Sequence, residues 1–165
     1  MDISMNMVTQ YNKLANEAGH PETKMHAVVG NLLDDGDDVP EGFETFDLIV
    51  MSMALHHVAD PDLMIRRLSE RLVEGGVLIV VDWVSHAESG CEPPKPAADS
   101  PVRHTVSKHG FTEGEVEAGF RGAGLEGWGW RWFAERSTLP AEFGGEHQLF
   151  LARGRKQGVN AAVKI

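Results

Sequence analysis

Hydrophobic residues recur at helical spacing near the start of the chain and in short continuous runs further on. Across residues 5–18, apolar side chains return every three or four positions until Gly19 and Pro21 end the run, which predicts an amphipathic helix. The apolar segment 25–29 predicts a short buried strand. Residues 32–44 hold four aspartates, two glycines and a proline, a composition that predicts a loop.

Two continuous apolar runs in the middle of the chain indicate strands of a parallel sheet. Residues 46–53 and 77–81 are rich in valine, isoleucine and methionine, as strands buried on both faces are. Between them, the Asp-Pro pair at 60–61 marks the start of a helix, because aspartate caps free N–H groups and proline fits the first helical position. The glycine pair at 75–76 predicts the end of that helix.

A long segment without periodicity separates these strands from the last part of the chain. Residues 86–108 include four prolines and predict a long loop or lid. After it, Thr112 and Glu115 form a capping-box pattern at the start of a helix, and Gly124 predicts where that helix closes.

Alternating aromatic residues mark the next strand. Trp128, Trp130 and Trp132 are spaced by two, which predicts a strand with one aromatic face packed on a helix. Residues 147–152 predict the final strand, antiparallel to the previous one because the two are close in sequence. The order of strands and helices therefore predicts an α/β fold with a mostly parallel sheet.

Composition excludes several classes of function. With a formal net charge of -10, the chain is not expected to bind nucleic acid or anionic membranes. A single cysteine rules out an intrachain disulfide framework and a cysteine-rich zinc site. The aspartates at 34–38 lack the spacing of an EF-hand, so no metal site is predicted. The chain shows neither a signal peptide nor a membrane span, and the expected location is cytoplasmic.

Several segments together resemble the class I S-adenosylmethionine (SAM) dependent methyltransferases of the small-molecule type. The stretch FDLIVMSMALHHVADP, the helix after it and GGVLIVVDW resemble the fourth strand, its helix and the fifth strand. HGFTEGEVEAGFRGAGLEGW resembles the helix before the sixth strand, and HQLFLARGRK the terminal strand. MDISMNM and VVGNLL resemble the ends of the second and third strands. The resemblance implies a Rossmann-like fold in one incomplete domain over 1–156, with a tail at 157–165.

One part of the family pattern is missing from the sequence. In that family the first strand leads into a glycine-rich turn that holds the methionine end of SAM, and here only Met1 precedes Asp2. The resemblance therefore implies a fold truncated at its N-terminus, with the edge of the fourth strand unpaired. Three arrangements remain open: the strand at 25–29 moves inward, two chains pair these edges as a homodimer, or the sequence is incomplete.

The resemblance implies six cofactor-binding positions at the ends of three strands: Asp2, Ile3, Asn31, Leu32, Met51 and Ser52. Asp2 matches the carboxylate that accepts hydrogen bonds from the ribose hydroxyls, and its alternative is a frayed terminal residue. Asn31 matches an adenine contact, and its alternative is a turn residue after a strand. Met51 and Ser52 match the segment beside the SAM methyl group, and their alternative is ordinary strand packing.

The adjacent histidines His56 and His57 are the predicted catalytic residues. An imidazole near the transferred methyl group could remove a proton from the acceptor, because its pKa lies near working pH. The alternative is a packing or capping role at the start of the next helix. Trp83, at the same edge of the sheet, either lines a substrate pocket or packs beneath the lid.

These observations predict a SAM-dependent methyltransferase that acts on a small-molecule acceptor, with SAM as its cofactor. The alternative is a catalytically inactive methyltransferase-like partner or scaffold protein, because the glycine-rich loop is absent.

Overall fold

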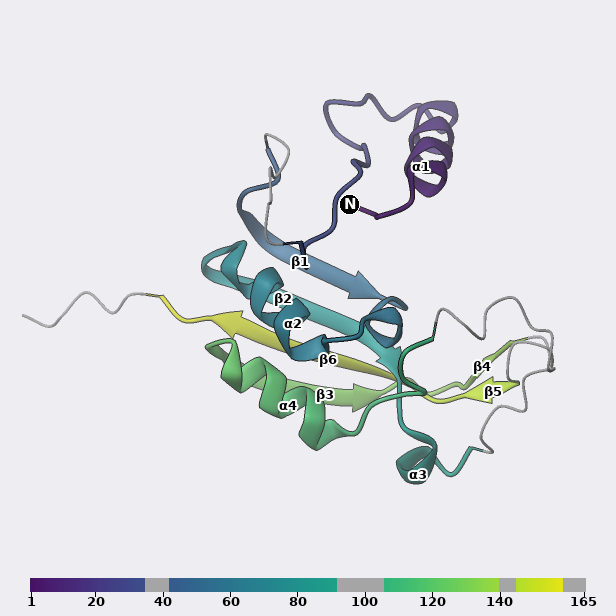
Figure 1. Ribbon diagram of the computed structural model, residues 1–165, viewed down its shortest axis with the longest axis vertical. Helices are drawn as coiled ribbons and strands as arrows, with labels where there is room; N and C mark the ends of the chain where they lie inside the picture. The colour runs from purple at the N-terminus through teal and green to yellow at the C-terminus, as the bar shows by residue number, and fades with distance from the viewer. Residues whose placement is uncertain (35–41, 92–105, 140–144, 159–165) are drawn as a thin grey trace, which may run out of the picture. The chain divides into compact units, whose positions relative to one another are not determined.

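The computed structural model describes residues 1–34, 42–91, 106–139 and 145–158 (Figure 1). Three segments of the sequence lie largely outside these ranges: the acidic run at 34–38, the predicted lid at 86–108 and the predicted tail at 157–165. The chain divides into two compact units, Met1–Glu44 and Thr45–Ile165. No helix among the described residues is long and apolar enough to cross a membrane.

The unit Met1–Glu44 is built around the predicted first helix, α1 (Met5–Glu17). The Ser4 hydroxyl caps it by accepting from the Met7 N–H at 3.4 Å. Gly19 follows the helix with φ of 82°, a left-handed conformation that glycine adopts without a steric cost. The helix itself is confirmed, but of its predicted apolar residues Ala15 is buried whereas Met7, Tyr11 and Leu14 are exposed, and Val8 is buried instead.

The prediction of a strand at 25–29 is wrong. The backbone hydrogen bonds there are made with a side chain instead of with a neighbouring strand. The Asn12 amide accepts from the Ala27 N–H at 2.6 Å and donates to the Ala27 carbonyl at 3.0 Å. These side-chain bonds replace those of a ladder. Only Val29 pairs as a strand does, in a single parallel bridge with Asp2. The segment is not one of the strands of the four-stranded sheet described below.

The unit Thr45–Ile165 contains a four-stranded sheet in the order β1-β2-β6-β3 (Figure 1). β1 and β2 are parallel, whereas β6 runs antiparallel to both of its neighbours. The α/β class and the antiparallel last strand are therefore confirmed, and the parallel pairing of this sheet is confined to β1 and β2. The strands are β1 (Phe46–Ser52), β2 (Leu72–Trp83), β3 (Leu125–Trp132) and β6 (Leu149–Lys156).

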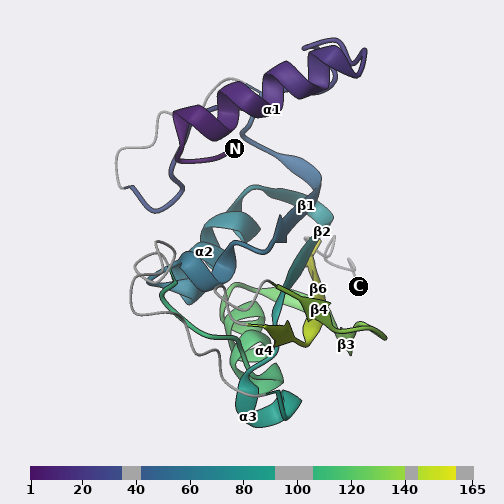
Figure 2. The ribbon, with the colours of Figure 1, turned by 90° about the vertical axis from the view of Figure 1, so that its right-hand side faces the viewer.

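Helices α2 and α4 lie together on one face of this sheet (Figures 1 and 2). Beneath them Leu78, Val80, Phe150 and Ala152 are completely buried. The remaining short elements lie in the connections. In chain order these elements and the two helices are η1 (Leu55–His57), α2 (Pro61–Glu70), α3 (His86–Ser89), α4 (Glu113–Gly122), β4 (Ser137–Thr138) and β5 (Glu146–His147).

The predicted helix starts are confirmed at both long helices of this unit. Asp60 caps α2 by accepting from the Leu63 N–H at 2.9 Å. At α4, the Thr112 hydroxyl accepts from the Glu115 N–H, and the Glu115 carboxylate accepts in return from the Thr112 N–H at 2.9 Å. The cap of α2 and the capping box of α4 satisfy N–H groups that the helices themselves leave without a partner.

The glycine pair at 75–76 does not end a helix as predicted. α2 already ends at Glu70, and both glycines lie inside β2, where its register with β1 shifts. Gly75 has φ of 78°, which suits the irregular backbone there. A Cβ on Gly76 would lie 2.9 Å from the Val73 carbonyl oxygen, so the close backbone approach requires glycine.

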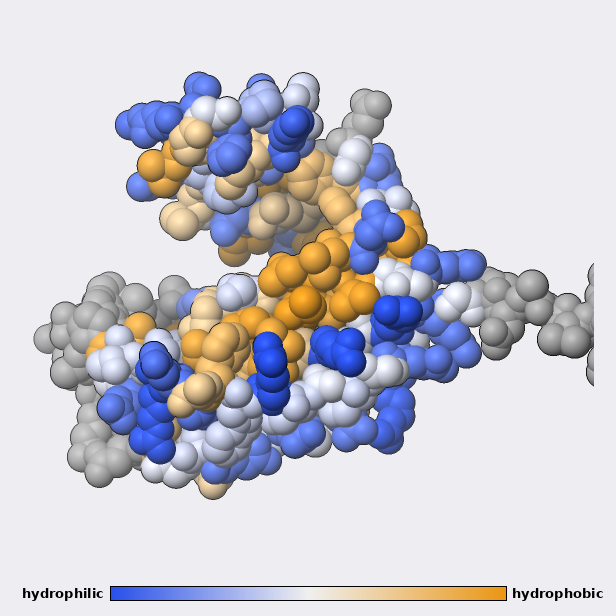
Figure 3. Space-filling view, turned by 180° about the vertical axis from the view of Figure 1, so that it is seen from behind, coloured by the Kyte–Doolittle hydropathy of each residue, from blue (hydrophilic) through white to orange (hydrophobic). Residues whose placement is uncertain are grey.

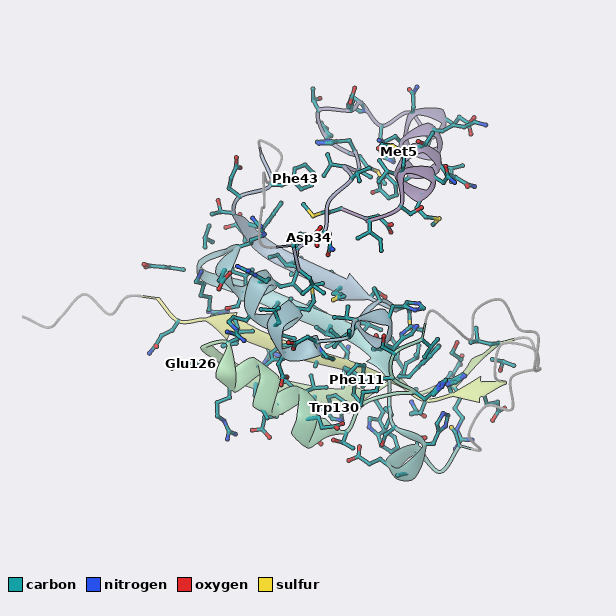
Figure 4. The ribbon with its side chains drawn as sticks, viewed as in Figure 1. Met5, Asp34, Phe43, Phe111, Glu126 and Trp130 are labelled. Atoms are coloured by element: carbon teal, nitrogen blue, oxygen red, sulfur yellow. The ribbon has the colours of Figure 1, made fainter. Side chains whose placement is uncertain are left out.

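The aromatic strand is confirmed, and two of its tryptophans, which are half-buried, pack against buried phenylalanines. Trp130 stacks on Phe150 with ring centroids 4.0 Å apart, and Phe111 meets Phe150 edge-on at 6.4 Å (Figure 4). Trp128 contacts Phe120 of α4 at 5.1 Å. The face therefore packs on a helix, as predicted, while Trp132 at the strand's end stays exposed.

Replacing Thr112 with alanine removes the hydroxyl half of the α4 capping box. We expect Thr112→Ala to lower the free energy of unfolding by about 1 kcal/mol, measured by urea denaturation. Thr112→Ser keeps the hydroxyl and should stay within about 0.5 kcal/mol of the wild type. Equal losses in both variants would contradict a role for the cap.

Candidate functional site

In the unit Met1–Glu44, a parallel bridge brings the predicted ribose and adenine positions together. The Asp2 N–H donates to the Val28 carbonyl at 3.1 Å, and the Gly30 N–H donates to the Asp2 carbonyl at 3.1 Å. Asp2 is therefore not frayed, and its backbone lies beside the segment that leads into Asn31.

The side chains of these positions already have local partners. Asp2 Oδ1 accepts from the Ser4 N–H at 2.8 Å, while the residue as a whole is exposed. Asn31 Oδ1 accepts from the Leu33 N–H at 3.1 Å, and its Nδ2 donates to Asp34 at 2.9 Å. Asn31 thus makes the side-chain turn that the sequence offered as its alternative. Leu32 is half-buried, and Ile3 is 74% exposed.

In the unit Thr45–Ile165, Met51 and Ser52 lie at the carboxyl end of β1, as predicted. The residue after them, Met53, has φ of 52°, in the left-handed region that costs a non-glycine residue about 1–2 kcal/mol. Its N–H donates to the Val81 carbonyl at 2.8 Å, which holds the turn against β2. Strain of this kind is concentrated at functional sites in proteins. No pattern in the sequence marks Met53.

A buried carboxylate fixes the predicted catalytic histidine. Asp82 is completely buried and accepts from the His56 N–H at 3.1 Å and the Trp83 N–H at 2.7 Å. The His56 Nδ1 lies 2.8 Å from Asp82 Oδ1, and because a carboxylate only accepts, Nδ1 carries the proton. His56 is 3% exposed, whereas His57 beside it is exposed.

Stacked rings extend from His56 across the end of the sheet. The His56 ring lies 3.9 Å from the ring of Trp83, which stacks in turn on His147 at 4.4 Å. His86 approaches His147 with ring centroids 5.6 Å apart. Trp83 therefore packs between two imidazoles, and it is 7% exposed.

His147 is the site histidine that the sequence did not reveal. It is 2% exposed, and among the described residues neither of its ring nitrogens has a hydrogen-bond partner. Burial, together with nearby His86, His109 and His56, lowers its pKa to about 4. Burial and His109 also lower the pKa of His86. His147 therefore stays neutral at physiological pH, and no local sequence signal indicates this, because its neighbours come from distant segments.

The returning end of the predicted lid is anchored on the histidine pair. The N–H groups of Ser107 and Lys108 donate to the His56 carbonyl at 2.9 and 3.1 Å. The Ser107 hydroxyl donates to the His57 carbonyl at 2.9 Å. In the part of the chain that the structure describes, no three histidine, cysteine or acidic side chains form a metal site.

Removing the buried carboxylate should destabilise the fold strongly. Asp82→Ala leaves three N–H donors inside the protein without an acceptor, and we expect the free energy of unfolding to fall by about 3 kcal/mol. Asp47→Ala, at an exposed position of β1, should change it by less than about 0.5 kcal/mol. Urea denaturation of both variants makes the comparison, and similar losses would show that Asp82 has no special structural role.

The lowered pKa of His147 predicts a pH-dependent stability. Because the unfolded chain binds a proton near pH 6.5 and the native chain only near pH 4, stability should fall as the pH drops through this window. The loss reaches about 3 kcal/mol at most. His147→Phe keeps a ring for stacking but does not titrate, so unfolding curves between pH 4 and 7 should show a shallower slope for it. Parallel slopes would contradict the shifted pKa.

Comparisons with known proteins point to one family. The model of a methyltransferase domain family matches residues 1–78. An uncharacterised methyltransferase of Schizosaccharomyces pombe is 32% identical over 128 residues, which cover 76% of this chain and 44% of the relative. A ubiquinone biosynthesis O-methyltransferase of Mesorhizobium japonicum is 32% identical over 71 residues, covering 40% of this chain and 28% of the relative. The chain thus spans less than half the length of these curated relatives.

Solved structures share the fold at lower identity. YcgJ from Bacillus subtilis has a TM-score of 0.64 and 16% identity, covering 94% of this chain and 80% of that one. A SAM-dependent methyltransferase from Methanosarcina mazei has a TM-score of 0.64 and 19% identity, covering 95% and 80%. The [4+2]-cyclase SpnF reaches 0.67 at 15% identity, covering 94% and 65%, so the shared fold does not fix the reaction. With its Rossmann-like fold and its methyltransferase relatives, the chain belongs to the class I SAM-dependent methyltransferase family.

Proposed function

We propose that this protein takes part in SAM-dependent methyl transfer to a small-molecule acceptor. Membership of the family supports the reaction and the cofactor, which supplies an electrophilic methyl group when bound. The chain spans less than half the length of its curated relatives. Methyl transfer by the whole protein is therefore also proposed. The comparisons do not favour the inactive alternative.

The observation that carries the proposal is the bridge between Asp2 and Val29. It places an exposed carboxylate beside the turn at Asn31, within one unit. One carboxylate oxygen accepts from the Ser4 N–H, and the exposed position leaves the group accessible to a vicinal diol. These residues fit the adenosine part of SAM, with Asp2 and Ile3 at the ribose and Asn31 and Leu32 at the adenine.

In the unit Thr45–Ile165, the residues proposed for methyl transfer lie at the end of β1. Ligands of open α/β sheets bind outside the carboxyl ends of the strands, which is where Met51 and Ser52 lie. The left-handed turn at Met53 is the strained feature at this end. We assign Met51 and Ser52 to the transfer of the methyl group.

The histidine pair is the proposed source of a base. The Asp82 carboxylate orients the His56 ring and fixes its tautomer, as a carboxylate does for a general base. His57 is the exposed member of the pair and is the one that solvent or an acceptor reaches more readily. Either imidazole would take the proton that an acceptor hydroxyl or amine loses on methylation.

The class of acceptor rests on two independent observations. One relative is named as an O-methyltransferase of ubiquinone biosynthesis, which suggests a hydroxyl group on a small organic molecule. The net charge of -10 disfavours nucleic acid as the acceptor. We therefore propose oxygen as the nucleophile.

Calorimetric titration of the purified chain with SAM, and with its demethylated product, tests the cofactor site. We expect binding in the micromolar range, weakened about tenfold in Asp2→Asn, because the amide loses the charge that strengthens hydrogen bonds from the diol. Glu126→Gln removes one negative charge from an exposed position on β3 and should bind like the wild type.

Two other outcomes of the titration are decisive. Absence of heat at millimolar SAM contradicts the proposal for this chain. Binding that Asp2→Asn leaves unchanged would place the ribose elsewhere.

A further inference from the structure

We propose that β5 (Glu146–His147) is an acid-sensitive latch at the predicted catalytic end of the sheet: protonation of His147 moves its ring out of the stack on Trp83. β5 pairs with β4 in a two-stranded ribbon outside the four-stranded sheet. The ring of His147 lies 4.4 Å from that of Trp83, with 19° between their planes. His147 therefore joins the ribbon to the end of β2 through its side chain.

The two imidazoles that stack on Trp83 differ in what can stabilise a positive charge. His56 has the Asp82 carboxylate 2.8 Å from its Nδ1. His147 is 2% exposed, and within the described ranges neither of its ring nitrogens has a hydrogen-bond partner. A proton on a buried imidazole of this kind costs desolvation energy that no ion pair offsets. The stack thus accommodates His147 only as a neutral ring.

The titratable groups around His147 oppose a positive charge as well. Burial lowers its pKa to about 4, and three histidines from other elements add to the shift: His86, His109 and His56. Each of these rings carries either no charge or a positive one. On β5 itself, the exposed Glu146 carboxylate is paired with Arg136 at 3.3 Å. The carboxylate next to His147 in the chain is therefore already paired with a cation.

The ladder that holds β5 is short, so β5 can separate without unfolding of the core. β4 and β5 pair over two residues each. One further backbone bond closes the ribbon, from the Leu139 N–H to the Gly145 carbonyl at 2.8 Å. Short ladders at the surface open at a lower free energy than core strands do. A buried charge on His147 is therefore relieved most easily by local separation of β5.

The backbone of Trp83 is held independently of β5. Its N–H donates to Asp82 Oδ1 at 2.7 Å, and its carbonyl accepts from the Phe111 N–H at 2.8 Å. Trp83 also pairs with Leu149 of β6, inside the four-stranded sheet. Departure of His147 therefore exposes the indole to water and leaves the sheet intact.

The latch keeps the predicted catalytic end assembled while His147 is neutral. The indole supports the ring of His56 at 3.9 Å. Once His147 leaves, water reaches the other side of this support, and the position of the predicted base becomes less fixed. This consequence for methyl transfer rests on the proposed function, whereas the release of His147 does not.

NMR spectra of the full chain between pH 7 and pH 4 test the latch through the indole N–H signals of its four tryptophans. A ring that reaches water binds a proton near pH 6.5, whereas the buried ring does so only near pH 4. The open population should therefore rise about tenfold for each pH unit by which the pH falls between these values. We expect the Trp83 signal to shift accordingly, while the signal of Trp130, stacked on Phe150, stays in place.

Variants that cannot bind a proton at position 147 make the test specific. His147→Phe keeps a ring on the indole, and His147→Gln has a smaller side chain, so neither should show the Trp83 transition. His20→Gln is the matched control, since it removes an exposed histidine of the unit Met1–Glu44 and should titrate like the wild type.

Association between molecules is a separate source of spectral change. Figure 3 shows apolar residues on the sheet face opposite α2 and α4, among them the exposed Leu48 and Val50 of β1. Release of the latch is intramolecular, so the transition should be the same at two protein concentrations.

Four outcomes overturn the proposal. They are a Trp83 signal that does not move in the wild type, a transition that persists in both His147 variants, a midpoint that depends on concentration, and a transition that coincides with loss of the far-ultraviolet circular dichroism of the whole fold. The measurement involves no SAM, so its failure is distinguishable from failure of the proposed function.

Discussion

The carboxylate of Asp82 is the interaction on which the predicted catalytic end of the sheet depends. It is completely buried at the end of β2, yet each of its oxygens accepts from N–H groups of His56 or Trp83. A buried charge is tolerated only when it is satisfied in this way. By bonding both the backbone and the ring of His56, it fixes the connection after β1 to the end of β2. Two further contacts depend on the position of this histidine. Ser107, near the end of the predicted lid, donates its N–H to the His56 carbonyl, and Trp83 stacks on the His56 ring.

Local patterns in the sequence were sufficient for most of the elements. The caps at Asp60 and Thr112 were predictable because each satisfies N–H groups within three residues, and the alternating tryptophans because a strand has a period of two. The strand at 25–29 failed because its apolar residues look like a strand, while the amide of Asn12, fifteen residues away, takes its hydrogen bonds. Gly75 and Gly76 were wrongly predicted to end a helix. Glycine suits a helix end and an irregular strand equally well, so the pair alone does not distinguish the two.

The candidate site was predictable where it follows strand ends and hidden where it depends on tertiary contacts. Asp2, Asn31, Met51 and Ser52 were predicted from the resemblance, in which these positions follow strands of an open α/β sheet. The pairing of His56 with Asp82 and the burial of His147 were not, because these partners lie far apart in sequence and meet only when β2 and β5 are in place. The strained turn at Met53 has no signature in sequence, since methionine rarely adopts that backbone.

The position of β6 has a consequence for how the chain folds as it is synthesised. β6 covers residues 149–156, yet it lies between β2 and β3 in the sheet. Until the ribosome has released those residues, one edge of β2 has no partner and β3 has no sheet to join. Until then apolar strands stay unpaired, and the core closes through contacts between segments that are distant in sequence. Contacts of this kind slow folding in general, and unpaired apolar strands favour aggregation until they are covered.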